Sequence, residues 1–163
     1  IGTFSKSIAP AIRMSYLVLP ESLCKLYETR CGFINSTVSK VDQLILQKFI
    51  EDGYYERHLN KMRELYKSRH DTLLAALKSW KPDFRISGEN AGVHLLLHFH
   101  DSRSEEELIR LAASGGIKVY GLSEYYVERK NEKPESVILL GYANMNEEKI
   151  KEAAGLLKKA WSM

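Results

Sequence analysis

A regular spacing of apolar residues in the middle of the chain constrains its fold most strongly. Between residues 55 and 80, large apolar side chains recur three, four or seven positions apart, at Leu59, Met62, Tyr66, Leu73, Leu77 and Trp80. This spacing places them on one face of an α-helix. A helix of about 26 residues is roughly 40 Å long at 1.5 Å per residue. The pattern therefore predicts one long connecting helix that separates two differently patterned regions.

The region before this helix indicates a loop, a strand and then helices. Residues 2–11 are rich in turn formers, and residues 12–19 are apolar and β-branched enough to predict a strand buried on both faces. Helices are predicted over 21–30 and 38–52, the second ended by Gly53.

The region after residue 80 alternates between strand and helix patterns. Strands are predicted over 92–100, 117–122 and 136–143, and helices over 104–116 and 146–161. Ser104 and Asn146 are the expected helix caps. This β-α-β-β-α order favours a two-layer domain with helices against one side of a short sheet, so the fold class is α/β.

Composition excludes several classes of function. The chain has 163 residues, 44% of them hydrophobic, and a net charge of +3 whose charges are dispersed rather than clustered. Charge thus gives no argument for nucleic acid or membrane binding by these residues. Because no apolar run is long enough to cross a bilayer and no leader pattern is present, we expect a cytoplasmic protein. Cys24 and Cys31 have no ligand-type spacing and are expected to be buried thiols.

Three histidines alternate along one predicted strand, at His94, His98 and His100. A His-x-His pair on a strand can bind zinc, but no acid or cysteine accompanies these residues at ligand spacing. We therefore expect a half-buried histidine cluster and no metal site.

The strongest chemical pattern lies at the start of the chain, in Thr3, Ser5, Lys6 and Arg13. Schiff-base chemistry needs a lysine amine that is neutral part of the time, and a nearby cation favours that state. A phosphorylated cofactor needs hydroxyl donors and a guanidinium that matches phosphate oxygens. The spacing alone favours an ordinary surface loop with a solvated lysine.

The segment GTFSKSIAPAIRMSYLVLP, residues 2–20, resembles the lysine segment of fold-type I pyridoxal-phosphate enzymes. Its form is typical of the aminotransferase-like domain of MocR/GabR-type transcriptional regulators of the GntR superfamily. Residues 36–77, 89–99, 116–126 and 138–157 are similar to later segments of those regulators, in the same order. The resemblance implies that residues 1–53 are the end of the large cofactor-binding domain, 54–80 the long connecting helix, and 81–163 the small C-terminal α/β domain.

The resemblance also implies roles for individual residues. Lys6 would form the Schiff base with pyridoxal 5'-phosphate, and Arg13 would hold the cofactor phosphate. Thr3 stands where the family has a hydroxyl that hydrogen-bonds the same phosphate, and Ser5 is a weaker candidate for that contact.

Two further features bear on the ligand. Ser36 and Thr37 lie where related dimers place a loop near the neighbouring subunit's cofactor, although a polar turn between helices explains them equally well. Aminotransferases commonly hold the substrate carboxylate with an arginine near the strand that corresponds to 136–145. No arginine occurs in that segment, so the substrates of amino-acid aminotransferases cannot be transferred to this chain.

Three hypotheses of function follow. In the first, the chain is the effector part of a homodimeric regulator that senses pyridoxal phosphate or an amino compound at Lys6 and binds DNA only through a domain preceding these residues. In the second, the parent protein is a genuine class I/II aminotransferase. In the third, the chain is only a dimerisation and packing module. In all three, we expect the 163 residues alone to be catalytically inactive.

Overall fold

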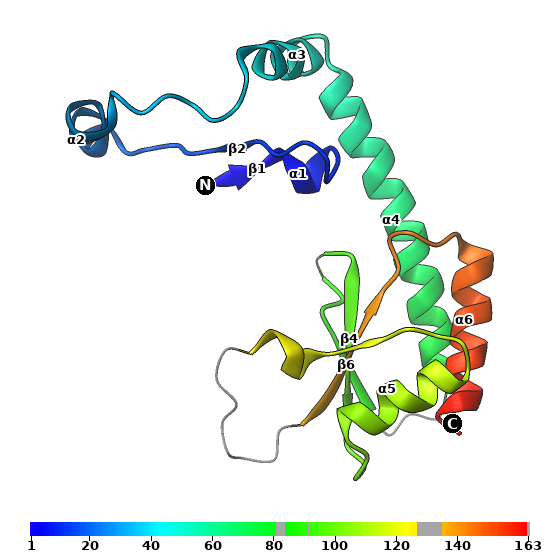
Figure 1. Ribbon diagram of the computed structural model, residues 1–163. Helices are drawn as coiled ribbons and strands as arrows, with labels where there is room; N and C mark the ends of the chain where they lie inside the picture. The colour runs from blue at the N-terminus through cyan, green and yellow to red at the C-terminus, as the bar shows by residue number, and fades with distance from the viewer. Residues whose placement is uncertain (81–83, 91, 127–134, 163) are drawn as a thin grey trace. The chain divides into compact units, whose positions relative to one another are not determined.

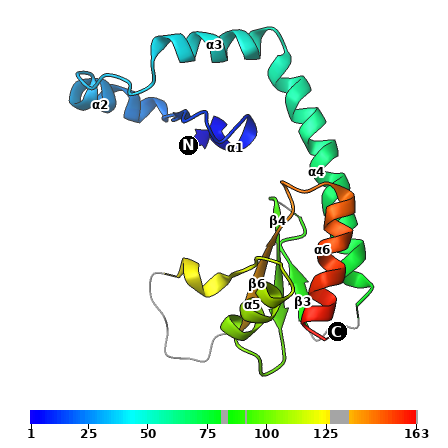
Figure 2. The same ribbon diagram turned by 45° about the vertical axis from the view of Figure 1, so that its right-hand side comes forward.

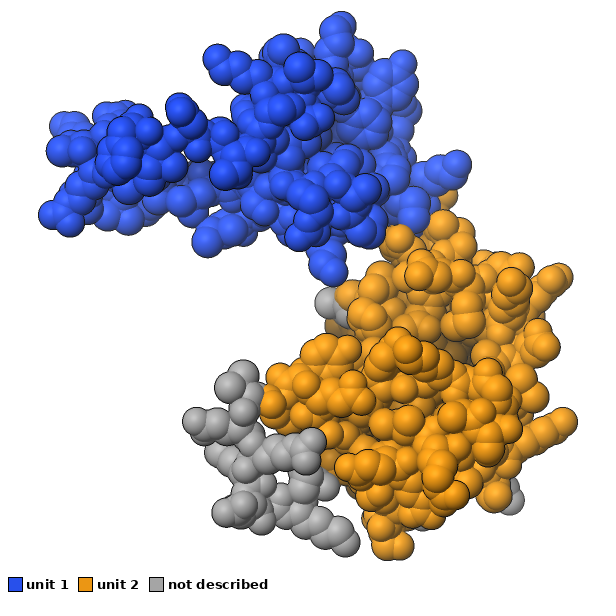
Figure 3. Space-filling model, in the orientation of Figure 1, with its two compact units in different colours: residues 1–63 blue, residues 64–163 orange. Residues whose placement is uncertain are grey.

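The computed structural model describes residues 1–80, 84–90, 92–126 and 135–162. The chain divides into two compact units, residues 1–63 and 64–163 (Figure 3). The boundary falls within helix α4, Tyr54–Lys78 (Figure 1). The predicted long helix is thus confirmed, and it contributes residues to both units. The division into domains at residues 53 and 80 stays a prediction.

Unit 1 contains a two-stranded sheet, three further helices and the beginning of α4. In chain order its elements are β1 Gly2–Thr3, α1 Phe4–Ser7, β2 Ser15–Tyr16, α2 Glu21–Cys31 and α3 Lys40–Glu51. β1 and β2 pair antiparallel. Helix α3 is capped by Ser39, whose hydroxyl accepts a hydrogen bond of 3.1 Å from the Asp42 amide.

The strand expected over 12–19 is much shorter than predicted. It is β2, two residues long, and the apolar side chains that follow it are exposed, Leu17 by 54% and Val18 by 75%. The expectation that this strand is buried on both faces is wrong for the described residues. The physical reason is that β2 pairs only with β1, and Leu17 and Val18 lie beyond the residues that pair.

Unit 2 holds a four-stranded antiparallel sheet in the order β3-β4-β6-β5. After α4, its elements are β3 Phe84–Ser87, β4 His94–Phe99, α5 Glu105–Ser114, β5 Tyr120–Gly121, the 3-10 helix η1 Leu122–Tyr125, β6 Ser136–Gly141 and α6 Glu147–Ala160. Strand β3 was not predicted from the sequence. Residues 127–136 are mostly charged and contain Pro134, which predicts an exposed loop, and residues 127–134 lie outside the described part of the chain.

One face of this sheet packs against the helices. Leu95 and Leu97 of β4 are fully buried with Ile138 of β6, and helix residues from α4, α5 and α6 complete the core, including Leu77, Leu108, Ile150 and Trp161. Figures 1 and 2 show α6 beside the C-terminal part of α4. The helices cover a single face, which confirms the predicted two-layer α/β architecture.

The predicted caps of unit 2 are confirmed. The Ser104 hydroxyl accepts from the Glu107 amide at 3.2 Å, and the Asn146 side chain accepts from the Lys149 amide at 2.9 Å. None of the helices in the described part of the chain has the length and apolar character needed to span a bilayer.

Candidate functional site

The lysine loop of unit 1 is a compact hairpin that folds on its own backbone. The Phe4 amide and the Thr3 hydroxyl both donate to the Met14 carbonyl oxygen, at 3.0 and 3.1 Å. The Thr3 hydroxyl also accepts from the Ser5 amide at 3.2 Å, which makes Thr3 the N-cap of α1. These contacts fix the short helix that carries Lys6.

Ser5 is the one buried polar residue of this loop, 9% exposed. Its hydroxyl donates to the carbonyl oxygen of Ile12, on the opposite arm of the hairpin. Because that proton is used within the loop, the Ser5 hydroxyl joins the two arms of the hairpin.

An aromatic cluster packs against the loop and includes a residue from the start of α4. The Tyr55 hydroxyl, at the start of α4, donates to the Ser7 hydroxyl at 3.1 Å. The Phe4 ring packs edge-on against Tyr55, with centroids 5.9 Å apart, and lies 5.3 Å from the Tyr16 ring. No local pattern predicts this hydrogen bond, because the two partners are 48 residues apart.

The two cations of the loop are both exposed. Within the described residues, the Lys6 amine makes no hydrogen bond or ion pair. The Arg13 guanidinium makes only a long hydrogen bond of 3.5 Å to the Pro10 carbonyl oxygen. Both groups are therefore available to a ligand.

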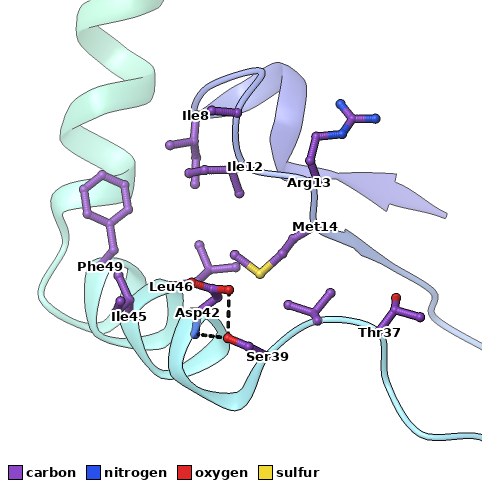
Figure 4. A pocket seen from close by; sticks show the side chains of 12 residues that line it. Ile8, Ile12, Arg13, Met14, Thr37, Ser39, Asp42, Ile45, Leu46 and Phe49 are labelled. Atoms are coloured by element: carbon purple, nitrogen blue, oxygen red, sulfur yellow. Dashed lines mark hydrogen bonds between the residues drawn. The ribbon is translucent and has the colours of Figure 1, made fainter.

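A cavity of about 550 Å³ lies between the returning arm of the loop and helix α3 (Figure 4). Its walls are mainly apolar, formed by Ile8, Ala11, Ile12, Met14, Val38, Ile45, Leu46 and Phe49, with Arg13, Thr37, Ser39 and Asp42 at its polar part. Figure 4 shows the Arg13 side chain extending away from the apolar side chains. The structure thus brings Arg13 and Thr37 to one cavity.

The other candidate residues lie elsewhere in unit 1. Ser36 lines a neighbouring cavity of about 480 Å³, and its hydroxyl accepts from the Val38 amide at 3.2 Å, as in a polar turn. Thr3, Ser5 and Lys6 line neither of these two cavities.

The donor set can be compared with the groups of pyridoxal phosphate. The cofactor offers an aldehyde, which combines with a free amine, and a phosphate, which pairs with a guanidinium. Lys6 and Arg13 have these groups, both without a strong partner among the described residues, and so fit the cofactor. The hydroxyls of Thr3 and Ser5 donate to backbone carbonyl oxygens of the loop itself. They therefore hold the backbone beside Lys6 and do not offer a proton to the cofactor phosphate.

A metal-dependent site has no support in the described residues. They contain no group of three or more His, Cys, Asp and Glu side chains suited to holding a metal ion. Both cysteines are free and partly buried.

Comparison with known families identifies the fold. The family described as "Aminotransferase class I and II" matches residues 1–157. The chain belongs to this family. The match begins ahead of the lysine loop and extends into α6, so it includes both compact units, and it confirms the expected resemblance to aminotransferase-like domains.

The curated relatives of the chain include transcription regulators. The HTH-type transcriptional regulator YhdI of Bacillus subtilis is 38% identical over 163 residues, which cover 99% of this chain and 34% of YhdI. The probable rhizopine catabolism regulatory protein MocR of Rhizobium meliloti is 28% identical over 99% of this chain and 32% of its own length. The chain therefore spans about a third of the length of these relatives.

Solved aminotransferases share the fold. LysN of Thermus thermophilus, an alpha-aminoadipate aminotransferase, aligns with a TM-score of 0.78 at 24% identity, over 99% of this chain and 41% of LysN. This likeness confirms the fold of a fold-type I aminotransferase.

Proposed function

We propose that this chain is the C-terminal effector part of a MocR-type transcription regulator that senses pyridoxal phosphate or an amino compound through Lys6. The observation that carries the proposal is the 38% identity to the regulator YhdI along 99% of the chain. The identity to the aminotransferase LysN over the same length is 24%.

The cofactor proposal rests on the family and on the free groups of the lysine loop. LysN is described in complex with N-(5'-phosphopyridoxyl)-L-leucine, a phosphopyridoxyl compound. When bound, pyridoxal phosphate supplies an aldehyde carbon that forms a C=N bond with primary amines. In this chain the Lys6 amine would take that bond, and the Arg13 guanidinium would pair with the phosphate.

The loop prepares Lys6 for exchange with a second amine. Thr3 caps α1 and the buried Ser5 joins both arms of the hairpin, so the backbone that carries Lys6 is held without a ligand. With an amine ligand in the site, the exposed Lys6 side chain would be free to hold a proton at Nζ. A change in the position or charge of Lys6 is then the signal that the protein transmits.

The partners of the whole protein belong to the same proposal. A homodimer would place Ser36 or Thr37 of one subunit near the cofactor of the other, and DNA would be bound by a helix-turn-helix domain that precedes these residues. Support comes from YhdI, which is described as an HTH-type regulator.

A genuine aminotransferase is the second candidate. It is favoured by the match to the aminotransferase family over residues 1–157 and by the fold shared with LysN. In this reading Lys6, once released, also serves as a general base that moves the α-proton of an amino acid.

One set of measurements on the full-length protein tests the cofactor claim and separates the two candidates. Added pyridoxal phosphate should give a visible absorption band that is lost in Lys6→Ala and kept in Lys25→Ala, a control that removes an exposed lysine of α2. The regulator should then respond to amino compounds with altered DNA binding and without keto-acid production. Sustained keto-acid production by a protein with no DNA-binding domain would favour the enzyme, and the absence of any band would leave only the packing module.

A further inference from the structure

Three side chains form a hydrogen-bonded chain on the sheet of unit 2, remote in sequence from the lysine loop. The Ser87 hydroxyl, at the end of β3, lies 2.7 Å from Nε2 of His98 in β4. Nδ1 of the same ring lies 2.9 Å from Oε2 of Glu135, the residue before β6. A single imidazole thus joins a serine to a carboxylate.

Strand register places this chain on the sheet face that the helices leave open. In β4, Leu97 and Phe99 point into the core, so His98 between them points to the opposite face. The antiparallel pairing sets Arg85 of β3 opposite His98, which puts Ser87 on the same face two residues along.

The electrostatics of the cluster determine which ring nitrogen carries the proton. The hydrogen bond from His98 is the main cause that lowers the pKa of Glu135, and the charge of Arg85 acts in the same direction. At neutral pH the carboxylate is ionised and can only accept. Nδ1 of His98 must therefore donate to it, and in the neutral ring Nε2 is left to accept the proton of Ser87.

This order of roles is the one found in serine nucleophiles, where a base takes the hydroxyl proton and an acid orients the base. Burial agrees with it. The His98 side chain is only 13% exposed, whereas Ser87 is half-buried and lies on an edge strand of the sheet. The imidazole is thus held in place, and Ser87 is the more exposed partner on the edge strand.

We propose that Ser87 is a nucleophilic serine that accepts acyl groups from activated carboxylic esters, with His98 as its general base and Glu135 as a positioning residue. In the step, a bond forms between Ser87 Oγ and the ester carbonyl carbon, and the bond from that carbon to the leaving oxygen breaks. The serine proton passes to His98 Nε2 and from there to the leaving oxygen, giving an acyl-serine and an alcohol. Water then releases the carboxylic acid and restores the serine.

The test uses p-nitrophenyl acetate as the acyl donor and the intact chain as the acceptor. Mass spectrometry of the digested protein should find an acetyl group on Ser87, and Ser87→Ala should abolish it. His98→Gln should slow acetylation of Ser87 at least about tenfold, because general bases contribute 10²–10⁴-fold to such steps. Glu135→Gln should slow it by a smaller factor.

Ser68 provides a matched control within the same molecule. Its hydroxyl donates directly to the Glu147 carboxylate at 2.8 Å, without an imidazole between them. The ratio of acetylation at Ser87 to that at Ser68 should exceed ten, and it should fall towards one in His98→Gln. Circular dichroism of His98→Gln should match that of the unaltered chain, because unfolding of the variant would also bring the ratio towards one. Equal acetylation of the two serines, or a ratio unchanged in His98→Gln, would overturn the proposal.

Discussion

The buried hydroxyl of Ser5 donates a hydrogen bond to the carbonyl oxygen of Ile12. Each of these residues is followed directly by one of the two exposed cations of the loop, Lys6 after Ser5 and Arg13 after Ile12. This single bond therefore links the two backbone positions that carry the amine and the guanidinium. It sets their separation before any cofactor arrives, which lowers the entropy cost of binding a ligand that needs both.

Replacing Ser5 by alanine should therefore weaken cofactor binding without removing a cofactor contact. Without this bond, cofactor binding must itself order the two arms of the loop. That ordering uses up to about 1–2 kcal/mol of binding free energy, so the dissociation constant should rise by up to roughly 5- to 30-fold. Titration of the full-length protein with pyridoxal phosphate measures this dissociation constant. Ser22→Ala, at an exposed serine of α2, is the control, and equal affinities of the two variants would contradict the role of Ser5.

The core of unit 2 should depend strongly on Leu95. This side chain is fully buried between the sheet and the helices, and truncating it to alanine should lower the free energy of unfolding by about 2–5 kcal/mol. Chemical denaturation followed by circular dichroism measures the loss. Leu17→Ala removes the same atoms from an exposed site and should change stability by less than about 0.5 kcal/mol. Similar losses for the two variants would show that the burial pattern is wrong.

The buried carboxylate of Glu105 should stabilise the packing of α5 against the sheet. Its carboxylate accepts from the Val137 amide at 3.1 Å and from the Ser123 amide at 3.2 Å. Glu105→Gln keeps the shape but weakens these charge-assisted bonds, so stability should fall by about 1–3 kcal/mol. Glu107→Gln, in the same first turn of α5 but exposed, removes the same favourable charge from the helix N-terminus. If Glu105→Gln loses no more stability than Glu107→Gln, the buried carboxylate does not have this role.

Asp101 should make part of the stability dependent on acid pH. The hydrogen bond from the Arg103 side chain is the main cause that lowers the pKa of Asp101 below its ordinary value of 3.8. Because the folded pKa is the lower one, this stabilisation is fully present above about pH 5 and is lost as the pH falls through the folded value.

The matching measurement compares unfolding free energies at pH 6 and pH 3. Asp101→Asn should reduce the decrease on acidification, and Arg103→Gln should reduce it by a similar amount because it removes the cause of the shift. The decrease in unfolding free energy between pH 6 and pH 3 should be nearly the same in the double variant as in either single variant, since all three lack the same pair. An unchanged pH dependence in Asp101→Asn would disprove this assignment.

Local sequence patterns were sufficient for the long elements of the fold. The spacing of Leu73, Leu77 and Trp80 predicted a helix face, and all three are buried. Ser104 and Asn146 followed from capping rules that depend on only three neighbouring residues. Strand β3 was not predicted because its four residues are too few to show a clear pattern. Its extended structure depends on its pairing with β4.

In the candidate site, too, the residue types could be predicted from the sequence but the contacts between distant residues could not. Lys6 and Arg13 could be selected because amine and guanidinium chemistry belongs to the residues themselves. The bond from Ser5 to Ile12 depends on how the loop closes, and the pairing of His98 with Ser87 and Glu135 depends on the register of strands up to 37 residues apart. No periodicity in the chain encodes either arrangement.

The most direct test of the central claim is the position of the covalent bond to the cofactor. Full-length protein is mixed with pyridoxal phosphate, reduced with borohydride to fix the carbon–nitrogen bond, digested and analysed by mass spectrometry. We expect a phosphopyridoxyl group on Lys6. A phosphopyridoxyl group found on other lysines while Lys6 stays unmodified, or no modified lysine at all, would contradict it.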